Sequence, residues 1–285
     1  MSAQVASISA QLTQQDLLVL VDDGSRAVCW ETLQTVLPAN YLCWSRLQGQ
    51  GSSASFLQLL LCDAPEGQYY FLADQDDVWL PGKLEGQLAS TPEHGMTVHG
   101  WQVWNLVDHH SSGAAALPML DAKLQAMPLP QASVAHYFFE TPAPGMTMCM
   151  GHVCRVQLQR WVAELVLWAA TLPHDRILAA ATSTIGPVCV LPTPWVLYRQ
   201  HGCNLIGAPK EGVWGRLGQR LWRLRSMWRS LRAGAALYQA LRALGAALPA
   251  APWRLRLRSG LCDDRVARGL VWCAFVGRRR SEKTG

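Results

Sequence analysis

The sequence predicts an α/β fold with a mainly parallel central sheet, and three observations support this prediction. Continuous apolar runs at residues 17–21 and 69–73 have the length and composition of strands buried on both faces. Each run ends on acidic residues, where open α/β sheets bind their ligands. A helical pattern lies between the runs and gives a strand–helix–strand order. With 50% hydrophobic and 16% charged residues, the 285-residue chain can bury a large core and is not globally disordered.

The other elements follow in chain order. Val5, Ile8 and Leu12 lie three and four residues apart, which places them on one face of a short first helix. A second helix, with Phe56 and Leu60 on its apolar side, ends at the polar residues 63–67. Further strands are predicted at residues 97–103, 145–150, 187–191 and 195–198, and a loop at 109–118. Helices are predicted over 156–170 and from the residues that follow 173–175 through 181.

Charge is unevenly distributed along the chain. Residues 1–204 hold 8 Lys or Arg against 16 Asp or Glu, a net charge of −8. Residues 205–285 hold 17 against 4, a net charge of +13, and the two parts together give the +5 of the whole chain. After Gly207 the composition changes to Arg, Trp, Leu and Ala. We therefore predict two units, a domain over 1–207 and a basic helical extension over 208–285.

Cysteine usage and hydropathy indicate the compartment. The nine cysteines form no C-x-x-C pair, which favours core or free thiols in a reducing environment. The first 16 residues lack the basic and apolar regions of a signal peptide, and no run reaches the roughly 18 apolar residues that span a bilayer. These features predict a cytoplasmic protein that is at most peripheral on the inner face of the cell membrane.

Two acidic clusters follow the apolar runs. The first contains Asp22 and Asp23, and the second contains Asp74, Asp76 and Asp77. Carboxylates this close repel one another, and a cation that neutralises them favours their retention. Hard oxygen ligands on a short loop suit Mg²⁺ or Mn²⁺, with substrate phosphates completing the shell. The alternative is that each cluster is only a solvated acidic turn.

Residues 73–84, with the sequence ADQDDVWLPGKL, resemble glycosyltransferase family 2, and specifically its bacterial rhamnosyltransferase-like members. The resemblance covers about residues 3–207 and implies a GT-A catalytic domain that inverts the sugar's anomeric configuration. It implies that Asp22 and Asp23 contact the nucleoside of a nucleotide-sugar donor. It also implies that Asp74 and Asp76, with Asp77 beside them, hold a metal ion on the donor diphosphate.

Three later segments agree with the family in order and spacing. Residues 144–148 are similar to its acceptor-side segment, and His174-Asp175 matches its His-Asp pair at a helix start. The resemblance implies that Asp175 is the catalytic base, with His174 the next candidate. Arg199 and His201 lie in a segment similar to the family's closing motif near the donor phosphates, and a guanidinium suits phosphate oxygens. The alternatives are a helix N-cap beside a surface histidine for the pair, and a structural role for His201.

The sequence departs from the family at three places. Family members begin with a strand and a polar turn, whereas this chain begins at the first helix, so we expect the first strand of the sheet to be missing. Arg176 and Ile177 follow the His-Asp pair where the family carries aromatic residues, and Gly100-Trp101 stands where it carries an acidic residue. We expect acceptor preference to differ for these reasons.

The basic extension contains one apolar helical stripe. Its members alternate spacings of three and four residues: Trp214, Leu217, Leu221, Leu224, Trp228, Leu231, Ala235 and Tyr238. Arginines lie between them, at positions 216, 220, 223, 225, 229 and 232. Such a helix can lie in the headgroup region of an anionic membrane and so approach a lipid-linked acceptor. Alternatively, its stripe packs on the domain. Nucleic acid is not expected, because no base-reading motif accompanies the charge.

Three functional hypotheses remain open. The first is a metal-dependent transferase of polysaccharide biosynthesis that moves rhamnose or a related hexose from a dTDP donor to a cell-surface glycan or lipid-linked acceptor. The second is a hexosyltransferase that uses a UDP-sugar. The third is a catalytically weak, membrane-associated partner protein that keeps the GT-A fold. The acidic clusters favour the first two hypotheses, and the expected loss of the first strand favours the third.

Overall fold

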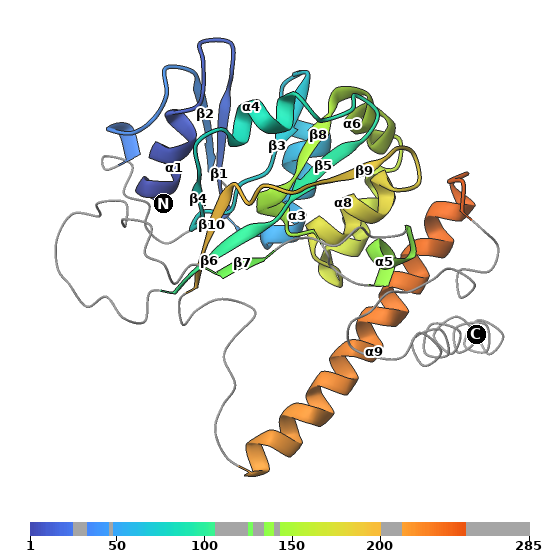
Figure 1. Cartoon of the computed structure of the whole chain (residues 1–285). Helices are drawn as coiled ribbons and strands as arrows, with labels where there is room; N and C mark the ends of the chain where they lie inside the picture. Colours follow the sequence, from blue (N-terminus) through green and yellow to red (C-terminus); the bar gives the residue numbers. More distant parts are fainter. Residues whose placement is uncertain are drawn as a thin grey trace.

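The computed structural model describes residues 1–24, 33–45, 48–105, 125–127, 134–139, 143–200 and 213–248. Within these ranges the chain is a mixed α/β structure, with helices packed around short strands and one long helix extending from the side (Figure 1). The predicted loop at 109–118 and the predicted boundary near 207 lie outside the described residues. No helix in these ranges is both long and apolar enough to cross a bilayer.

The strands are short. In chain order they are β1 (Leu18–Asp22), β2 (Tyr41–Ser45), β3 (Tyr69–Phe71), β4 (Val78–Trp79), β5 (Met96–His99), β6 (Trp101–Asn105), β7 (Gln125–Met127), β8 (Cys149–Gly151), β9 (Val188–Leu191) and β10 (Val196–Gln200). The α-helices are α1 (Ser2–Ser9), α3 (Ser52–Gln58), α4 (Lys83–Leu88), α5 (Val134–Phe139), α6 (His152–Gln159), α7 (Val162–Leu167), α8 (His174–Thr182) and α9 (Val213–Ala243). A π-helical turn, η1 (Leu59–Asp63), extends α3, and 3-10 turns occur at η2 (Gly145–Thr147) and η3 (Trp168–Ala170).

The prediction of a mainly parallel central sheet is wrong. The strands form a parallel pair β1-β2 and two mixed four-stranded sheets with the orders β4-β10-β6-β7 and β3-β8-β5-β9. In the latter sheet β8 runs antiparallel to both of its neighbours, and β5 pairs in parallel with β9. An apolar run in the sequence indicates that a strand is covered on both faces, but it does not indicate the strand's direction. Helices that cover a sheet produce the same apolar run in a parallel and in an antiparallel strand.

Several element boundaries also differ from the prediction. The strand predicted at 97–103 breaks at Gly100 into β5 and β6, which belong to different sheets. The helix predicted at 156–170 divides into α6, α7 and η3. In β1 only Leu18 and Leu20 are buried, so this strand is covered mainly on one face. Strand β2 is not among the predicted strands, although Tyr41 to Trp44 form an apolar run; in the structure this strand is largely exposed.

Two hydrophobic clusters fill the interior. The larger one joins β3, β5 and β8 to α3, α5, α6 and α8. The smaller one joins α1 and β1 to Trp79, Met146 and Val196. Five cysteines fall within the described residues, and no disulfide joins any of these five.

The second half of α9 is part of the larger cluster. Ala235, Leu237, Tyr238 and Leu241 are at most 1% exposed, and Trp228 packs against the same cluster. Burial runs through consecutive positions 234–238, so this half is enclosed on several sides and not along a single stripe. The packing alternative is therefore correct for this half. The first half, at residues 213–227, extends away from the other described elements (Figure 1).

Candidate active site

Residues 74–77 form the loop between β3 and β4. Asp74 and Asp76 are half-buried, and Asp77 is 1% exposed. Buried residues near both ends anchor the loop, because Leu72 precedes it and Val78 and Trp79 of β4 follow it in the hydrophobic interior. The loop therefore holds two half-buried carboxylates and one fully buried carboxylate.

Asp175, in the first turn of α8, is brought to the same region. Burial, followed by the charges of Asp76 and Asp175, raises the pKa of Asp74 to about 7. Burial raises the pKa of Asp175 to about 6, against the opposing effect of hydrogen bonds from the amides of Arg176 and Gly145. Two segments a hundred residues apart in the sequence thus place their carboxylates within electrostatic range of each other.

Asp77 connects the loop to β10. Its Oδ1 accepts a hydrogen bond from the backbone amide of Arg199 at 3.3 Å, and its buried Oδ2 has no hydrogen-bond partner among the described residues. Burial, followed by the charges of Asp74 and Asp76, raises the pKa of Asp77 to about 8, while Arg199 opposes the shift. The contact brings Arg199, a predicted phosphate ligand, beside the acidic loop.

A fully buried lysine lies behind this loop. Lys83 Nζ donates to Gln87 Oε1 at 2.7 Å and lies 4.6 Å from the centroid of the Trp79 ring. His99 Nδ1 donates to the Gly100 carbonyl at 2.5 Å, which leaves His99 Nε2 to accept from Lys83 Nζ at 3.0 Å. Burial lowers the pKa of Lys83 to about 7, and the charge of Asp77 opposes the shift. The segment 73–84, whose sequence carries the family resemblance, therefore includes a side chain of the protein interior.

His174 packs inside the protein next to Asp175. Its ring stacks on Phe56 with centroids 4.1 Å apart, and the side chain is 7% exposed. Burial lowers the pKa of His174 to about 4, so the ring is neutral at physiological pH. A Cβ on Gly145 would lie 2.5 Å from His174 Nε2, which explains the need for glycine there.

The carboxylate of Asp23 is engaged by the start of α3. It accepts hydrogen bonds from the backbone amides of Gln50 and Gly51, at 2.8 to 3.1 Å, and from Ser55 Oγ at 2.6 Å. Asp22 is the half-buried last residue of β1. Asp23 therefore joins the β1 end to α3. His201, the remaining predicted site residue, lies outside the described residues.

The acidic loop offers a partial set of metal ligands. In the described ranges no three His, Cys, Asp or Glu side chains are arranged to hold a metal ion by themselves. Asp74 and Asp76 are hard oxygen donors whose mutual repulsion a cation would relieve. Asp77 uses one oxygen on the Arg199 amide. This set fits a divalent cation that takes two carboxylates and completes its shell with donor phosphates and water.

Sequence reasoning missed three residues around the site. Lys83 lies within residues 73–84, but no sequence pattern there predicts that its side chain is buried. Gly145 lies in the segment assigned to the acceptor side, and only the position of His174 explains it. Arg176 was expected to influence acceptor preference. Its side chain is 2% exposed and faces the interior, and the neighbouring Ile177 is also buried.

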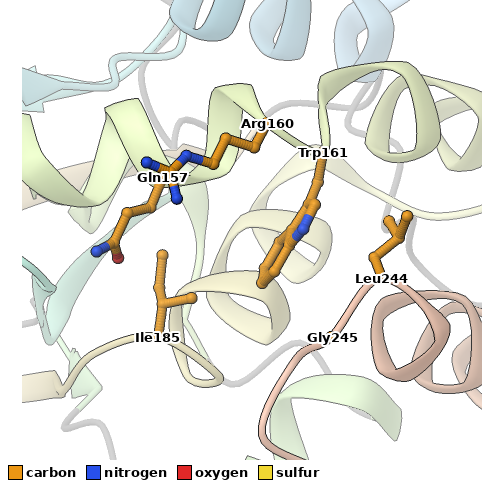
Figure 2. A pocket seen from close by; sticks show the side chains of 6 residues that line it. All are labelled: Gln157, Arg160, Trp161, Ile185, Leu244 and Gly245. Carbon is orange, nitrogen blue, oxygen red and sulfur yellow. The ribbon is translucent and has the colours of Figure 1, made fainter.

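A hollow of about 390 Å³ lies elsewhere on the molecule. It is lined by Gln157, Arg160, Trp161, Ile185, Leu244 and Gly245 (Figure 2). These residues come from the α6–α7 junction, the segment after α8 and the end of α9, and they include no carboxylate. The hollow therefore contains none of the candidate catalytic residues.

No protein-family model and no curated protein sequence matches the chain. Among solved structures, the chain is similar to S. aureus TarS 1–349, with a TM-score of 0.52 and 13% sequence identity. The similarity covers 98% of this chain and 67% of that chain. TarS is a GT-A glycosyltransferase of family 2. At this identity the likeness shows the fold alone, so the chain has a mixed α/β fold similar to a GT-A domain.

Proposed function

We propose that the chain is an inverting glycosyltransferase that moves a sugar from a nucleotide-diphosphate donor to a cell-surface glycan or lipid-linked acceptor. One observation carries the proposal: on a GT-A-like fold, the charge of Asp175 acts on the carboxyl of Asp74, which also interacts with Asp76. A base and a diphosphate site must be neighbours for a single displacement at the anomeric carbon. The sugar we propose is rhamnose or a related hexose, on the resemblance of residues 73–84.

In this reaction Asp175 takes the proton of the acceptor hydroxyl as that oxygen attacks the sugar. A pKa of about 6 suits the role, because the carboxylate is ionised at pH 7 but is more basic than an exposed aspartate. Asp74 and Asp76 would hold a Mg²⁺ or Mn²⁺ ion, which when bound stabilises negative charge on the leaving diphosphate. Arg199 would pair with phosphate oxygens. Asp22 would orient the nucleoside, with Asp23 holding the strand end on which Asp22 lies.

The test is hydrolysis of a panel of nucleotide sugars, including dTDP-rhamnose and UDP-glucose, with Mg²⁺ or Mn²⁺. We expect at least one donor to be turned over, and we expect Asp76→Ala or excess chelator to abolish turnover while the circular dichroism spectrum is unchanged. Undiminished donor turnover by the wild type in excess chelator would show that the reaction needs no metal ion. The donor that is turned over also decides between the rhamnosyl and UDP-hexosyl alternatives.

One observation favours the catalytically weak partner protein as a second candidate. The Asp23 carboxylate already accepts hydrogen bonds from two backbone amides and a hydroxyl, which reduces what it can offer a nucleoside. This candidate predicts no turnover of any donor in the panel. Binding of a nucleoside diphosphate without turnover, measured by calorimetry, would support it over the active enzyme.

We also propose that the first half of α9 contacts an anionic membrane surface. Residues 213–227 include four arginines at positions 216, 220, 223 and 225, and no acidic residue. This half extends away from the other described elements, so a flat surface could approach it (Figure 1). Each basic residue near an anionic surface contributes about 1 kcal/mol. Such contact would bring the catalytic residues toward a lipid-linked acceptor.

A further inference from the structure

The side chain of Arg176 joins three helices. Its Nε donates to the Phe138 carbonyl of α5 at 2.9 Å, and its Nη2 donates to the Ser230 carbonyl of α9 at 3.0 Å. Nη1 also donates to Ser230 Oγ, and Nη2 to the Phe138 carbonyl. Arg176 itself is the third residue of α8. One buried guanidinium therefore ties α8 to both α5 and α9.

The approach of α9 to this guanidinium depends on a glycine. A Cβ on Gly234 would lie 2.0 Å from the Phe138 carbonyl oxygen and 2.5 Å from Arg176 Nη2. Glycine is unfavourable inside a helix, so its presence here is explained by the close approach of the backbones. One turn later the Tyr238 ring meets the Phe138 ring edge-on, with centroids 4.9 Å apart. The junction is closely packed on both sides of Arg176.

The same junction lies directly beside the candidate base. The backbone amide of Arg176 donates to Asp175 Oδ1 at 2.7 Å, and the charge of Arg176 acts on the Asp175 carboxyl. Movement of the Arg176 side chain would shift the backbone that carries this amide. The geometry of Asp175 therefore depends on contacts that α9 provides from 54 residues further along the chain.

We propose that Arg176 is a positioning residue, which uses α5 and α9 to fix the start of α8 and so the orientation of Asp175. The proposal rests on the proposed function in one respect only, the role of Asp175 as base. In this proposal α9 helps to orient the catalytic base. Arg176 then acts on the base Asp175, and it does not determine which acceptor is used. Lysine cannot reproduce the role in full, because it lacks the planar fork that bonds two carbonyls at once.

Arg155 provides a matched control. It is 3% exposed, and it donates from Nε to the Leu60 carbonyl at 2.6 Å and from Nη2 to the Ala64 carbonyl at 2.8 Å. Like Arg176, it is a buried arginine that holds backbone carbonyls of another element. Its other contacts are with Tyr70 of β3, where Nη1 donates to the hydroxyl at 3.3 Å and the guanidinium lies 4.8 Å from the ring centroid. None of these contacts is with α9 or Asp175. Loss of Arg155 should therefore reproduce the structural cost without the effect on the base.

The first measurement is hydrogen exchange by mass spectrometry on full-length Arg176→Met, Arg176→Lys, Gly234→Ala and Arg155→Met. We expect exchange at residues 174–178 and 228–241 to rise at least about tenfold in Arg176→Met and Gly234→Ala, and less in Arg176→Lys. Arg155→Met should raise exchange near residues 59–64 and 69–71, and not at 174–178 or 228–241. This readout needs no turnover, so it tests the junction even if no donor is hydrolysed and the proposed function fails. Unchanged exchange at 174–178 in Arg176→Met would overturn the proposal.

The second measurement is transfer kinetics, on whichever donor the wild type uses. We expect Arg176→Met to lower kcat about 10- to 100-fold with donor KM within about threefold, because the diphosphate site lies on other elements. Arg176→Lys should recover part of the loss, and Arg155→Met should keep its kcat at a temperature where it is folded. Equal losses of kcat in Arg176→Met and Arg155→Met would show that Arg176 contributes only to packing and does not position Asp175.

Discussion

At the scale of single residues, Asp175 is the side chain on which transfer should depend most directly. We expect Asp175→Asn to bind donor normally and to lose about 10²–10⁴-fold in the rate of transfer, because an amide cannot accept the acceptor proton. Single-turnover transfer and donor titration calorimetry measure the two quantities separately. The control is Asp63→Asn, which alters an exposed carboxylate at the end of η1. Near-normal transfer by Asp175→Asn would assign the base to another group.

The pH dependence of transfer follows from the environment of the same residue. Burial raises the pKa of Asp175 to about 6, and a base acts only in its ionised form. We therefore expect the single-turnover rate, with metal and donor saturating, to be flat at neutral pH. Below about pH 6 it should fall about tenfold per pH unit. A rate that stays level down to pH 4.5 would contradict a buried aspartate as the base.

Lys83 should give a different pH signature, in stability. Its folded-state pKa is lowered to about 7, whereas an unfolded lysine titrates near 10.5, so the unfolded state binds more protons between these values. Stability should therefore rise with pH by about 1 kcal/mol per unit through this window, and the rise should be absent in Lys83→Met. Urea unfolding at pH 8 and pH 9.5 tests this. Equal pH slopes in the two proteins would mean that Lys83 remains charged in the fold.

At the scale of elements, α4 depends on a glycine that faces an indole ring. A Cβ on Gly86 would lie 2.5 Å from two atoms of the Trp195 ring. Alanine favours a helix by up to about 1 kcal/mol, but we expect overpacking against Trp195 to outweigh this, so that Gly86→Ala destabilises by about 1–3 kcal/mol. Gly67→Ala, where the nearest atom is at 3.7 Å, is the control.

The double variant Gly86→Ala, Trp195→Leu tests the cause of that destabilisation. Removing the indole should make Gly86→Ala less harmful in the Trp195→Leu background than in the wild type, when urea midpoints are compared. Additive effects of the two substitutions would show that the ring contact is not responsible.

Elements were predictable where a local pattern decides them. The apolar run at 69–73 corresponds to β3, because a continuous apolar run reflects burial directly. The helix predicted after residues 173–175 and through 181 corresponds to α8. Strand direction and sheet membership were not predictable, because a break at Gly100 or the insertion of β8 between β3 and β5 depends on distant segments. The residues of the candidate site also fall into a part that the sequence predicts and a part that it does not. Acidic residues at strand ends marked the loop at 74–77, whereas the buried positions of Lys83 and Arg176 depend on contacts with other elements.

At the scale of the whole molecule, α9 has two parts with different surroundings. Removing residues 208–285 would delete Leu237 and Leu241 from the main core, so we expect the truncated protein to aggregate. Membrane binding is better tested by replacing the arginines at 216, 220, 223 and 225 with glutamine in the full chain. If half of them face the headgroups, the loss is about 2 kcal/mol, or roughly 30-fold in partitioning onto anionic vesicles.

Co-sedimentation with anionic and neutral vesicles measures this effect. The wild type should bind the anionic vesicles more weakly at high salt, because surface charges are then screened. Arg242→Gln, an exposed position at the end of α9, should bind like the wild type. Equal binding of the fourfold variant and the wild type would show that these arginines do not form a membrane-contacting surface.

A ribosome makes the chain from its N-terminus, so the partners of α9 are synthesised well before α9 itself. Phe138 is followed a hundred residues later by Tyr238, whose ring it contacts. At 5–20 residues per second, about 5–20 seconds separate the two residues during translation. During that interval α5 is made first and α8 later, and neither has α9 to cover its apolar surface. Chaperones that bind nascent apolar segments have this interval in which to act, and folding of the domain is completed only after α9 has emerged.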